Sequence, residues 1–444
     1  MPNKIQPRVP RGMRDILPKK MLLRQYVIRQ FEIVFQRFGF EPLQTPVLEL
    51  RETIMGKYGL DAEKLIYDAQ HREGKEELSL RYDLTVPLTR VVAMYPELVK
   101  PFKRYQIAPV WRAERPQKGR YREFYQCDVD IVGASSMLAD AEIVTMIYVL
   151  LTRLGFKSFV TKINNRKILI GIGQYAGVSN ELLGGLYRSI DKLQKIGPEG
   201  VREEMAQNRI PADVISKVMN LIAIPNGDFG ELREQLGSVP IVMQGLDELE
   251  QLASYLTATN VPPANYQFDF SMVRGLAYYT GPIYETIVTE PQIGSLTGGG
   301  RYDELVGLFS NQSIPVTGTS FGIERIIDVM EELSMFPPNL GKTVTQVLVT
   351  VFNRELVGTC IRLAYELRAA GWNTELGLDT DSLGKQLKYA GSKGIPFAAI
   401  IGPDEATAQR VTLRDLTTGE QTLLSQSDLP GALGQKLKAG AWTD

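Results

Sequence analysis

The chain has 444 residues and a net charge of −1, with 50 Lys and Arg against 51 Asp and Glu, so total charge gives no sign of a polyanionic partner. Hydrophobic residues make up 44% and charged residues 23%, which excludes general disorder. At about 150 residues per domain, we expect roughly three domains. The chain has one histidine, His71, and two cysteines, Cys127 and Cys360. These numbers exclude zinc sites made of clustered Cys and His, and a catalytic triad that needs a histidine could only use His71.

Nothing in the sequence predicts export or a membrane span. The first residues carry charges and prolines without an apolar stretch, and the longest apolar run, at 146–151, is far shorter than the ~18 residues that a span needs. Two distant cysteines are typical of a reducing compartment. We therefore expect a cytoplasmic protein without membrane contact, and we expect His71 to lie in a solvated turn.

The first part of the chain alternates between helical and extended patterns. Residues 20–38 have apolar residues at helical spacing, and Gly39 ends this predicted helix. Residues 78–86 alternate like a strand, and 85–95 continue as a helix. From Tyr105 to Val132, two β-like runs flank a polar loop, which predicts a long hairpin.

The rest of the chain divides by pattern. Residues 176–260 are helical in pattern, which predicts a helical insertion domain. Strand character returns at Tyr266, and we interpret GSLTGGGRYDEL, from Gly294, as a glycine loop followed by a helix near 320–330. Alternating β and α patterns near the C-terminus predict a largely parallel sheet. The expected domains are a catalytic domain at 1–175 and 261–333, the insertion at 176–260, a linker at 334–343 and an α/β domain at 344–444.

The strongest local signal is the charge of the hairpin. Residues 100–125 contain eight Lys and Arg and two Glu, in a chain that is nearly neutral overall. Aromatic residues lie between these cations, and such a pattern suits phosphates and stacked bases. The same charges would also suit a solvated basic face, so charge alone leaves both interpretations open.

Three further patterns carry polar groups. The sequence VRGLAYYTG at 273–281 can place an arginine and two tyrosine hydroxyls at a pocket, or it can be a strand with buried tyrosines. The glycines at 298–300 can let backbone approach a ligand, or they can form a turn. Asp130 lies in an apolar run, which favours a pocket position for its carboxylate.

Together these segments resemble the motifs of the histidyl-tRNA synthetases. In chain order they are PRGMRDILP, GFEPLQTPVLE, LRYDLT, WRAERPQKGRYREFYQCDVDIVG, VRGLAYYTG, GGGRYDEL and SFGIERI. GFEPLQTPVL resembles motif 1 of class II synthetases, with Pro46 as its hallmark proline; the WRAERPQKGRYREF segment resembles motif 2 and GIERI resembles motif 3. The resemblance implies an α+β catalytic domain with a mixed, mainly antiparallel sheet, a helical insertion, and a C-terminal α/β anticodon-binding domain.

The resemblance also implies an activity. Such enzymes activate L-histidine with ATP to the aminoacyl adenylate and transfer it to the 3′ end of tRNA(His). The substrate carboxylate is already ionised near pH 7, so this reaction needs positioning and positive charge rather than a protein base. The resemblance further implies Mg²⁺ with the ATP, a homodimer built around motif 1, contact between the insertion and the tRNA acceptor arm, and no zinc or organic cofactor.

Matching the motifs residue by residue implies three overlapping sets of site residues. The catalytic arginines would be Arg112, Arg274 and Arg325. ATP would contact Arg112, Glu114, Arg120, Phe124 and Arg325. Histidine would contact Asp83, Thr85, Arg112, Gln126, Asp130, Arg274, Tyr278 and Tyr279, with residues 294–302 as the floor. In this assignment Asp130 and Tyr279 read the two imidazole nitrogens. Ala277 departs from the acid that many relatives carry there.

Two alternatives remain. A non-catalytic regulatory paralogue would keep the catalytic fold, but such proteins generally lose the anticodon domain and the arginine signatures. A synthetase for another amino acid is disfavoured by the pairing of QCDVD with VRGLAYYTG. Because the three arginines and a C-terminal domain are all present, we favour the histidine enzyme.

Overall fold

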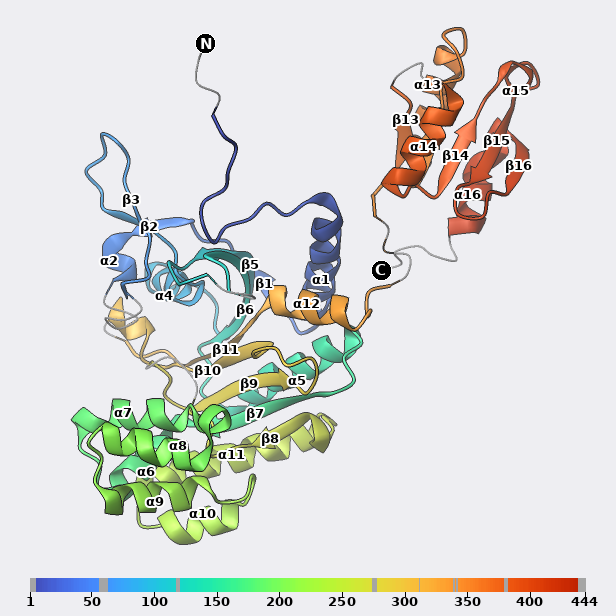
Figure 1. Cartoon of the computed structure of the whole chain (residues 1–444). Helices are drawn as coiled ribbons and strands as arrows, with labels where there is room; N and C mark the ends of the chain where they lie inside the picture. Colours follow the sequence, from blue (N-terminus) through green and yellow to red (C-terminus); the bar gives the residue numbers. More distant parts are fainter. Residues whose placement is uncertain are drawn as a thin grey trace. The chain divides into compact units, whose positions relative to one another are not determined.

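The computed structural model divides into two compact units, which are described separately (Figure 1). One unit contains Met1–Arg14 and Val27–Met335, and the other contains Asp15–Tyr26 and Phe336–Asp444. The predicted insertion and linker boundaries stay predictions. The structure describes residues 5–55, 63–116, 120–273, 278–310, 312–337, 340, 342–378 and 382–437.

The first unit is built on an eight-stranded sheet with the order β1-β5-β6-β11-β10-β9-β7-β8. The β1–β5 and β7–β8 pairs are parallel, and the other five pairs are antiparallel, so the expected mixed, mainly antiparallel sheet is confirmed. The strands are β1 (Glu41–Pro42), β5 (Phe102–Trp111), β6 (Glu123–Val132), β7 (Phe159–Asn165), β8 (Tyr266–Phe268), β9 (Pro282–Val288), β10 (Thr297–Arg301) and β11 (Val316–Phe321).

Helices with apolar faces pack on this sheet. Phe31 and Phe35 of α1 are buried, and their rings lie 5.1 and 6.0 Å from that of Phe321 on β11. A small sheet with the order β2-β4-β3 lies beside α2 and α4 (Figure 1). The helices are α1 (Pro18–Arg37, of which this unit contains the part from Val27), α2 (Arg51–Ile54), α4 (Thr85–Met94), α5 (Met137–Arg153) and α12 (Ile323–Glu332). The small sheet comprises β2 (Leu48–Leu50), β3 (Asp68–Ala69) and β4 (Leu78–Leu80).

The helical segment begins earlier than its pattern indicated. Asn165, at the end of β7, accepts a hydrogen bond from the Lys167 amide (3.0 Å) and so starts a helix at Arg166. Gly197, with φ of 72°, interrupts the third helix before Pro198. The grouped helices (Figure 1) are α6 (Arg166–Ala176), α7 (Asn180–Ile190), α8 (Leu193–Gln207), α9 (Ala212–Ile222), α10 (Phe229–Leu236) and α11 (Pro240–Ala258).

The glycines at 298–300 form the central strand β10, so the expected glycine loop is wrong. They are paired on one side with β9 and on the other with β11. A Cβ atom on Gly299 would lie 2.1 Å from the carbonyl oxygen of Gly318. Glycine is needed here because the neighbouring strand occupies the space of a side chain, rather than because the chain turns.

The second unit has a five-stranded sheet with the order β13-β12-β14-β15-β16. The expected alternation of strands and helices is present, but only β12–β13 and β12–β14 are parallel among the described pairs. The terminal hairpin adds two antiparallel strands, so the sheet is mixed rather than largely parallel. Its elements are β12 (Val347–Val349), α13 (Val357–Ala369), β13 (Thr374–Leu376), α14 (Leu383–Lys393), β14 (Phe397–Ile400), α15 (Pro403–Thr407), β15 (Arg410–Asp415), β16 (Gln421–Ser425) and α16 (Leu429–Leu437).

Candidate active site

Two adjoining cavities lie on the central strands of the first unit. The larger has a volume of about 440 Å³ and the smaller about 140 Å³. They adjoin because they share lining residues, so ligands bound in the two cavities would lie next to each other. The shared residues are Arg112, Gln126, Tyr279, Gly298, Gly299 and Ser320.

Alternate residues of β6 connect the two cavities. Successive side chains of a strand point to opposite faces, so Phe124, Gln126, Asp128 and Asp130 share one face. Phe124 lines the larger cavity, Gln126 lines both, and the two aspartates line the smaller. One strand therefore presents an aromatic ring, an amide and two carboxylates in order along a single continuous hollow.

Arg112 lies where the two cavities meet. It follows directly after β5, and its Nε donates a hydrogen bond to the Tyr82 carbonyl oxygen (3.1 Å). Its guanidinium lies over the rings of Tyr82 (4.3 Å) and Phe124 (5.1 Å). These contacts orient a permanent positive charge at the junction, where it can face an anionic group from either side.

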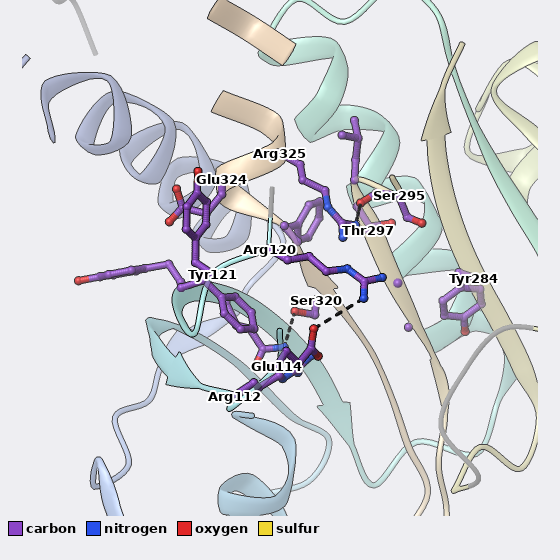
Figure 2. A pocket seen from close by; sticks show the side chains of 18 of the residues that line it. Arg112, Glu114, Arg120, Tyr121, Tyr284, Ser295, Thr297, Ser320, Glu324 and Arg325 are labelled. Carbon is purple, nitrogen blue, oxygen red and sulfur yellow. Dashed lines mark hydrogen bonds and ion pairs between the residues drawn. The ribbon is translucent and has the colours of Figure 1, made fainter. Parts of the chain in front are cut away.

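The larger cavity contains all of the residues predicted to contact ATP (Figure 2). Arg120 Nη1 lies 3.7 Å from Glu114 Oε2, and Arg325 Nη1 donates to the Ser295 carbonyl oxygen at 2.7 Å. Arg325 comes from α12, whereas Arg120 comes from the polar loop of the hairpin. Distant segments thus supply arginines to one hollow, which suits a ligand with several phosphates.

The smaller cavity contains the described residues predicted to contact histidine: Asp83, Thr85, Arg112, Gln126, Asp130, Tyr278 and Tyr279. Asp83 Oδ1 accepts hydrogen bonds from the backbone amides of Thr85 (3.1 Å) and Val86 (3.0 Å), and these bonds stabilise the start of α4. The strand predicted at 78–86 is shorter than expected: it ends at Leu80, and the helix begins at Thr85. The contribution of Arg274, and of its neighbour Ala277, lies outside the described residues.

A buried charge cluster forms the base of the smaller cavity. Arg104 on β5 is opposite Asp130 on β6, and its Nη2 lies 2.7 Å from Asp130 Oδ2. The same Nη2 donates to the Leu84 carbonyl oxygen (3.1 Å), and the Tyr302 hydroxyl donates to Asp130 Oδ1 (2.5 Å). Burial raises the pKa of Asp130, and the Arg104 guanidinium opposes that shift.

Asp128 belongs to the same cluster. Burial raises its pKa to about 7, against the opposing effect of Arg104, and the neighbouring Asp130 carboxylate adds to the rise. Two buried carboxylates thus face a single buried guanidinium. Such a site favours a positively charged or hydrogen-bond-donating ligand group.

Three tyrosines line the smaller cavity together with the two aspartates. The ring of Tyr278 lies 4.9 Å from that of Tyr279 and 5.6 Å from that of Tyr302. Burial raises the pKa of all three phenols, so each stays a neutral hydroxyl near pH 7. Neutral hydroxyls can donate hydrogen bonds to ligand nitrogen or oxygen atoms.

Sequence reasoning assigned no individual role to several residues of this site. Asp128 and Asp130 are two residues apart and so share one face of a strand, and this spacing would have indicated that Asp128 lines the same cavity as Asp130. Once the hairpin is drawn in register, Arg104 lies opposite Asp130. Tyr302 falls within the predicted floor at 294–302, but its bond to Asp130 depends on how β10 and β6 lie in space. Ser320 had no signal, because no strand was predicted at β11.

The structure bears on three of the earlier exclusions. His71 is exposed in a turn, where its carbonyl oxygen accepts the Gly74 amide (3.0 Å). Across the part of the chain that is described, no three His, Cys, Asp or Glu side chains gather as a metal site would require. None of the described helices combines the length and the apolar character needed to cross a membrane.

Comparisons with known proteins agree across the whole length of the chain. The family model for histidyl-tRNA synthetase matches residues 12–326, and the model for an anticodon-binding domain matches residues 346–436. The histidine–tRNA ligase of Aeropyrum pernix is 44% identical and that of Cytophaga hutchinsonii 41% identical, each over 440 residues. These alignments cover 98% and 94% of this chain, and 98% and 97% of the relatives.

Solved structures show the same relationship. The crystal structure of histidyl-tRNA synthetase from Nostoc sp. PCC 7120 matches with a TM-score of 0.86 at 32% identity, over 98% of this chain and 100% of that one. A Bacillus halodurans C protein described as an ATP phosphoribosyltransferase regulatory subunit/histidyl-tRNA synthetase shares the fold at 24% identity (TM-score 0.74), over 87% of this chain and 97% of that one. From its motifs, its fold and its full-length relatives, this chain belongs to the histidyl-tRNA synthetase family.

Proposed function

We propose that this protein is a histidine–tRNA ligase, which activates L-histidine with ATP to histidyl-adenylate and transfers the histidyl group to tRNA(His). The proposal rests on one observation about the candidate active site. A hollow lined by arginines joins a smaller hollow lined by carboxylates and hydroxyls, and Arg112 lies at their junction. ATP suits the first hollow and a zwitterionic amino acid with a polar ring suits the second.

The chemistry of activation explains why an arginine belongs at the junction. A histidine carboxylate oxygen forms a bond to the α-phosphorus of ATP, and the bond from that phosphorus to the bridging oxygen breaks, so that pyrophosphate leaves with the electron pair. Arg112 would contact both the reacting carboxylate and the α-phosphate, and Arg325 would contact the leaving phosphates. Because charge develops on oxygen atoms, fixed guanidinium groups stabilise the transition state.

The remaining predicted contacts follow the same division. Phe124 would stack on adenine with Glu114 near the adenine amino group, and Arg120 would add a phosphate contact. In the smaller cavity, Asp83, Thr85 and Gln126 would bind the α-ammonium group. Asp130 and Tyr279 would face the imidazole, and Arg274 would supply a second arginine at the α-phosphate.

Mg²⁺ would enter this site with ATP. The carboxylates of Glu114 and Glu324 line the larger cavity, and two carboxylates are fewer ligands than a metal site made of protein alone requires. Mg²⁺ commonly combines one or two carboxylates with substrate phosphates and water, so these residues fit a metal held mainly by ATP. When bound, it would neutralise phosphate charge.

Two further proposals concern partners and location. The tRNA would contact the C-terminal unit through its anticodon-binding domain, and the helices of the insertion would contact the acceptor arm. A homodimer would form around the motif 1 segment, where Val47, Leu48 and Leu50 are 40–44% exposed. We propose a cytoplasmic location, because translation consumes the charged tRNA there.

The test is ATP–pyrophosphate exchange with each of the twenty amino acids. We expect exchange that depends on histidine alone, followed by histidylation of tRNA(His). A regulatory paralogue would show no exchange, and a synthetase of different specificity would respond to another amino acid. Sedimentation equilibrium tests the dimer, and a mass of about 50 kDa at micromolar concentration would contradict it.

A further inference from the structure

Two carboxylates that line the smaller cavity, those of Asp128 and Asp130, each have one oxygen without a hydrogen-bond partner among the described residues. Asp130 Oδ1 accepts a hydrogen bond from the Tyr302 hydroxyl, and its Oδ2, although it accepts no hydrogen bond from a described residue, has an ion-pair partner in Arg104 Nη2 at 2.7 Å. Asp128 is equally buried, yet its Oδ1 accepts no hydrogen bond from any described residue. An unsatisfied buried carboxylate oxygen is costly, so its presence beside a cavity points to a ligand donor.

The strand neighbours of Asp128 are already engaged. Gln106 lies opposite on β5, and its Nε2 donates to Thr45 Oγ1 at 3.1 Å. Ser320 lies opposite on β11, accepts from Gln126 Nε2 at 3.2 Å, and has one hydroxyl proton with which to serve a single oxygen of Asp128. Ser320 therefore has no second proton for Asp128, and the second Nε2–H of Gln106 does not reach Asp128 Oδ1 as a hydrogen bond in this structure.

The surroundings leave room for a donor from the ligand. A Cβ atom on Gly298, which lines both cavities, would meet no atom within 4 Å. Gln126 Oε1, on the same face of β6, also accepts no hydrogen bond from a described residue. Three acceptors on this strand face, Gln126 Oε1, Asp128 Oδ1 and Asp130 Oδ2, thus lack a hydrogen-bond donor. A ligand with several donors, such as the α-ammonium group and the ring N–H of histidine, can supply them.

Building on the proposed function, we propose that Asp128 is a further histidine-binding residue, whose Oδ1 accepts a hydrogen bond from an imidazole N–H. Because neutral imidazole has a single N–H, Asp128 accepts that hydrogen bond, while Asp130, which Tyr302 and Arg104 contact, faces the ring without accepting one from it. Neutral phenols of Tyr278 and Tyr279 remain as donors for a ring nitrogen that carries no proton. An amino acid with a ring of similar size but no N–H leaves Asp128 buried and unsatisfied, so Asp128 contributes to specificity.

The test compares two ligands on three forms of the full chain. Binding of histidine and of 3-(thiazol-4-yl)alanine, whose ring has no N–H, is measured by calorimetry at about pH 8 for the wild type, Asp128→Asn and Asp128→Ala. We expect histidine to bind roughly tenfold more weakly to Asp128→Asn and up to roughly a hundredfold more weakly to Asp128→Ala. Affinity for the thiazole should change less than about threefold, because no N–H is lost.

The control is Glu49→Gln, which neutralises another buried carboxylate of the same unit. Glu49 binds Arg90 and lines neither cavity, so histidine affinity should stay within about twofold of the wild type. Equal affinities of wild type and Asp128 variants for histidine would overturn the inference, as would parallel losses for both ligands, which indicate a structural role. A wild type that binds no histidine would overturn the proposed function and, with it, this inference.

Discussion

Replacing Arg104 with methionine tests whether one guanidinium compensates the buried carboxylates. Arg104 is completely buried, lies 2.7 Å from Asp130 Oδ2, and donates to the Leu84 carbonyl oxygen at 3.1 Å. Methionine keeps the length and apolar contacts of the side chain but removes the charge. Because Arg104→Met leaves Asp130 and Asp128 without a counter-charge, we expect the catalytic unit to be destabilised at neutral pH.

The magnitude follows from the burial of the pair. Removing one partner of a buried ion pair costs about 3–5 kcal/mol. In a unit of this size, about 2 °C of melting temperature corresponds to 1 kcal/mol, so the expected fall is roughly 6–10 °C. Arg104 is also the group that opposes the raised pKa of Asp130, so in the variant this pKa rises further. Protonation then relieves the uncompensated charge, and the deficit should shrink as the pH falls.

The assay is thermal unfolding of wild type, Arg104→Met and the double variant Arg104→Met/Asp130→Asn at about pH 5 and pH 8. We expect the single variant to lose most stability at pH 8, and the double variant to recover at least half of the loss there. A fall of the same size at both pH values, or a double variant less stable than the single one, would refute the electrostatic reasoning.

Three further predictions concern the cavities. Asp128→Asn should change the dependence of stability on pH. Because the pKa of Asp128 is raised from 3.8 to about 7, the contribution of this group to the free energy of unfolding falls as the pH rises from about 4 to 7. Urea unfolding at both pH values should therefore show that the variant lacks this contribution. Gly318→Ala should reduce histidine-dependent exchange at least about a hundredfold, because the new Cβ would lie 2.0 Å from Asp130 Oδ1. In Gly298→Ala the new Cβ meets no atom within 4 Å, so this variant should fold normally. Equal behaviour of the two variants in exchange and in thermal unfolding would contradict this reasoning. Arg112→Ala should lower kcat/KM for exchange by about 10²–10³. Arg115 is an exposed arginine of the same segment and lines neither cavity, so Arg115→Ala should change kcat/KM by less than about threefold. Similar losses in both variants would show that the general charge of the segment matters, and not the position of Arg112.

Much of the local structure could be predicted because it depends on neighbours in the sequence. The spacing of Phe31 and Val34 predicts α1, and alternation on either side of a polar loop predicts the hairpin of β5 and β6. The prediction was wrong where contacts with a distant segment of the chain set the local conformation. Gly298–Gly300 contain the residues of a turn, but β9 and β11 lie on both sides and extend them into a strand.

The candidate site shows the same division. The motifs selected the arginines and the described residues of the smaller cavity, because residue types and order are visible in the chain. The pairing of Arg104 with Asp130 and the unsatisfied oxygen of Asp128 were not visible. Both depend on which strands lie side by side and in which register.

The sequence by itself indicated the family, the order of most helices and strands, and the scarcity of histidine and cysteine residues. Only the tertiary structure decided which charges are buried, which are paired, and where two cavities meet at Arg112. The physical reason is that helical spacing and strand alternation are set by neighbouring residues, whereas desolvation and charge pairing depend on segments far apart in the chain. A near-neutral chain can therefore bury two carboxylates against one guanidinium at a single site.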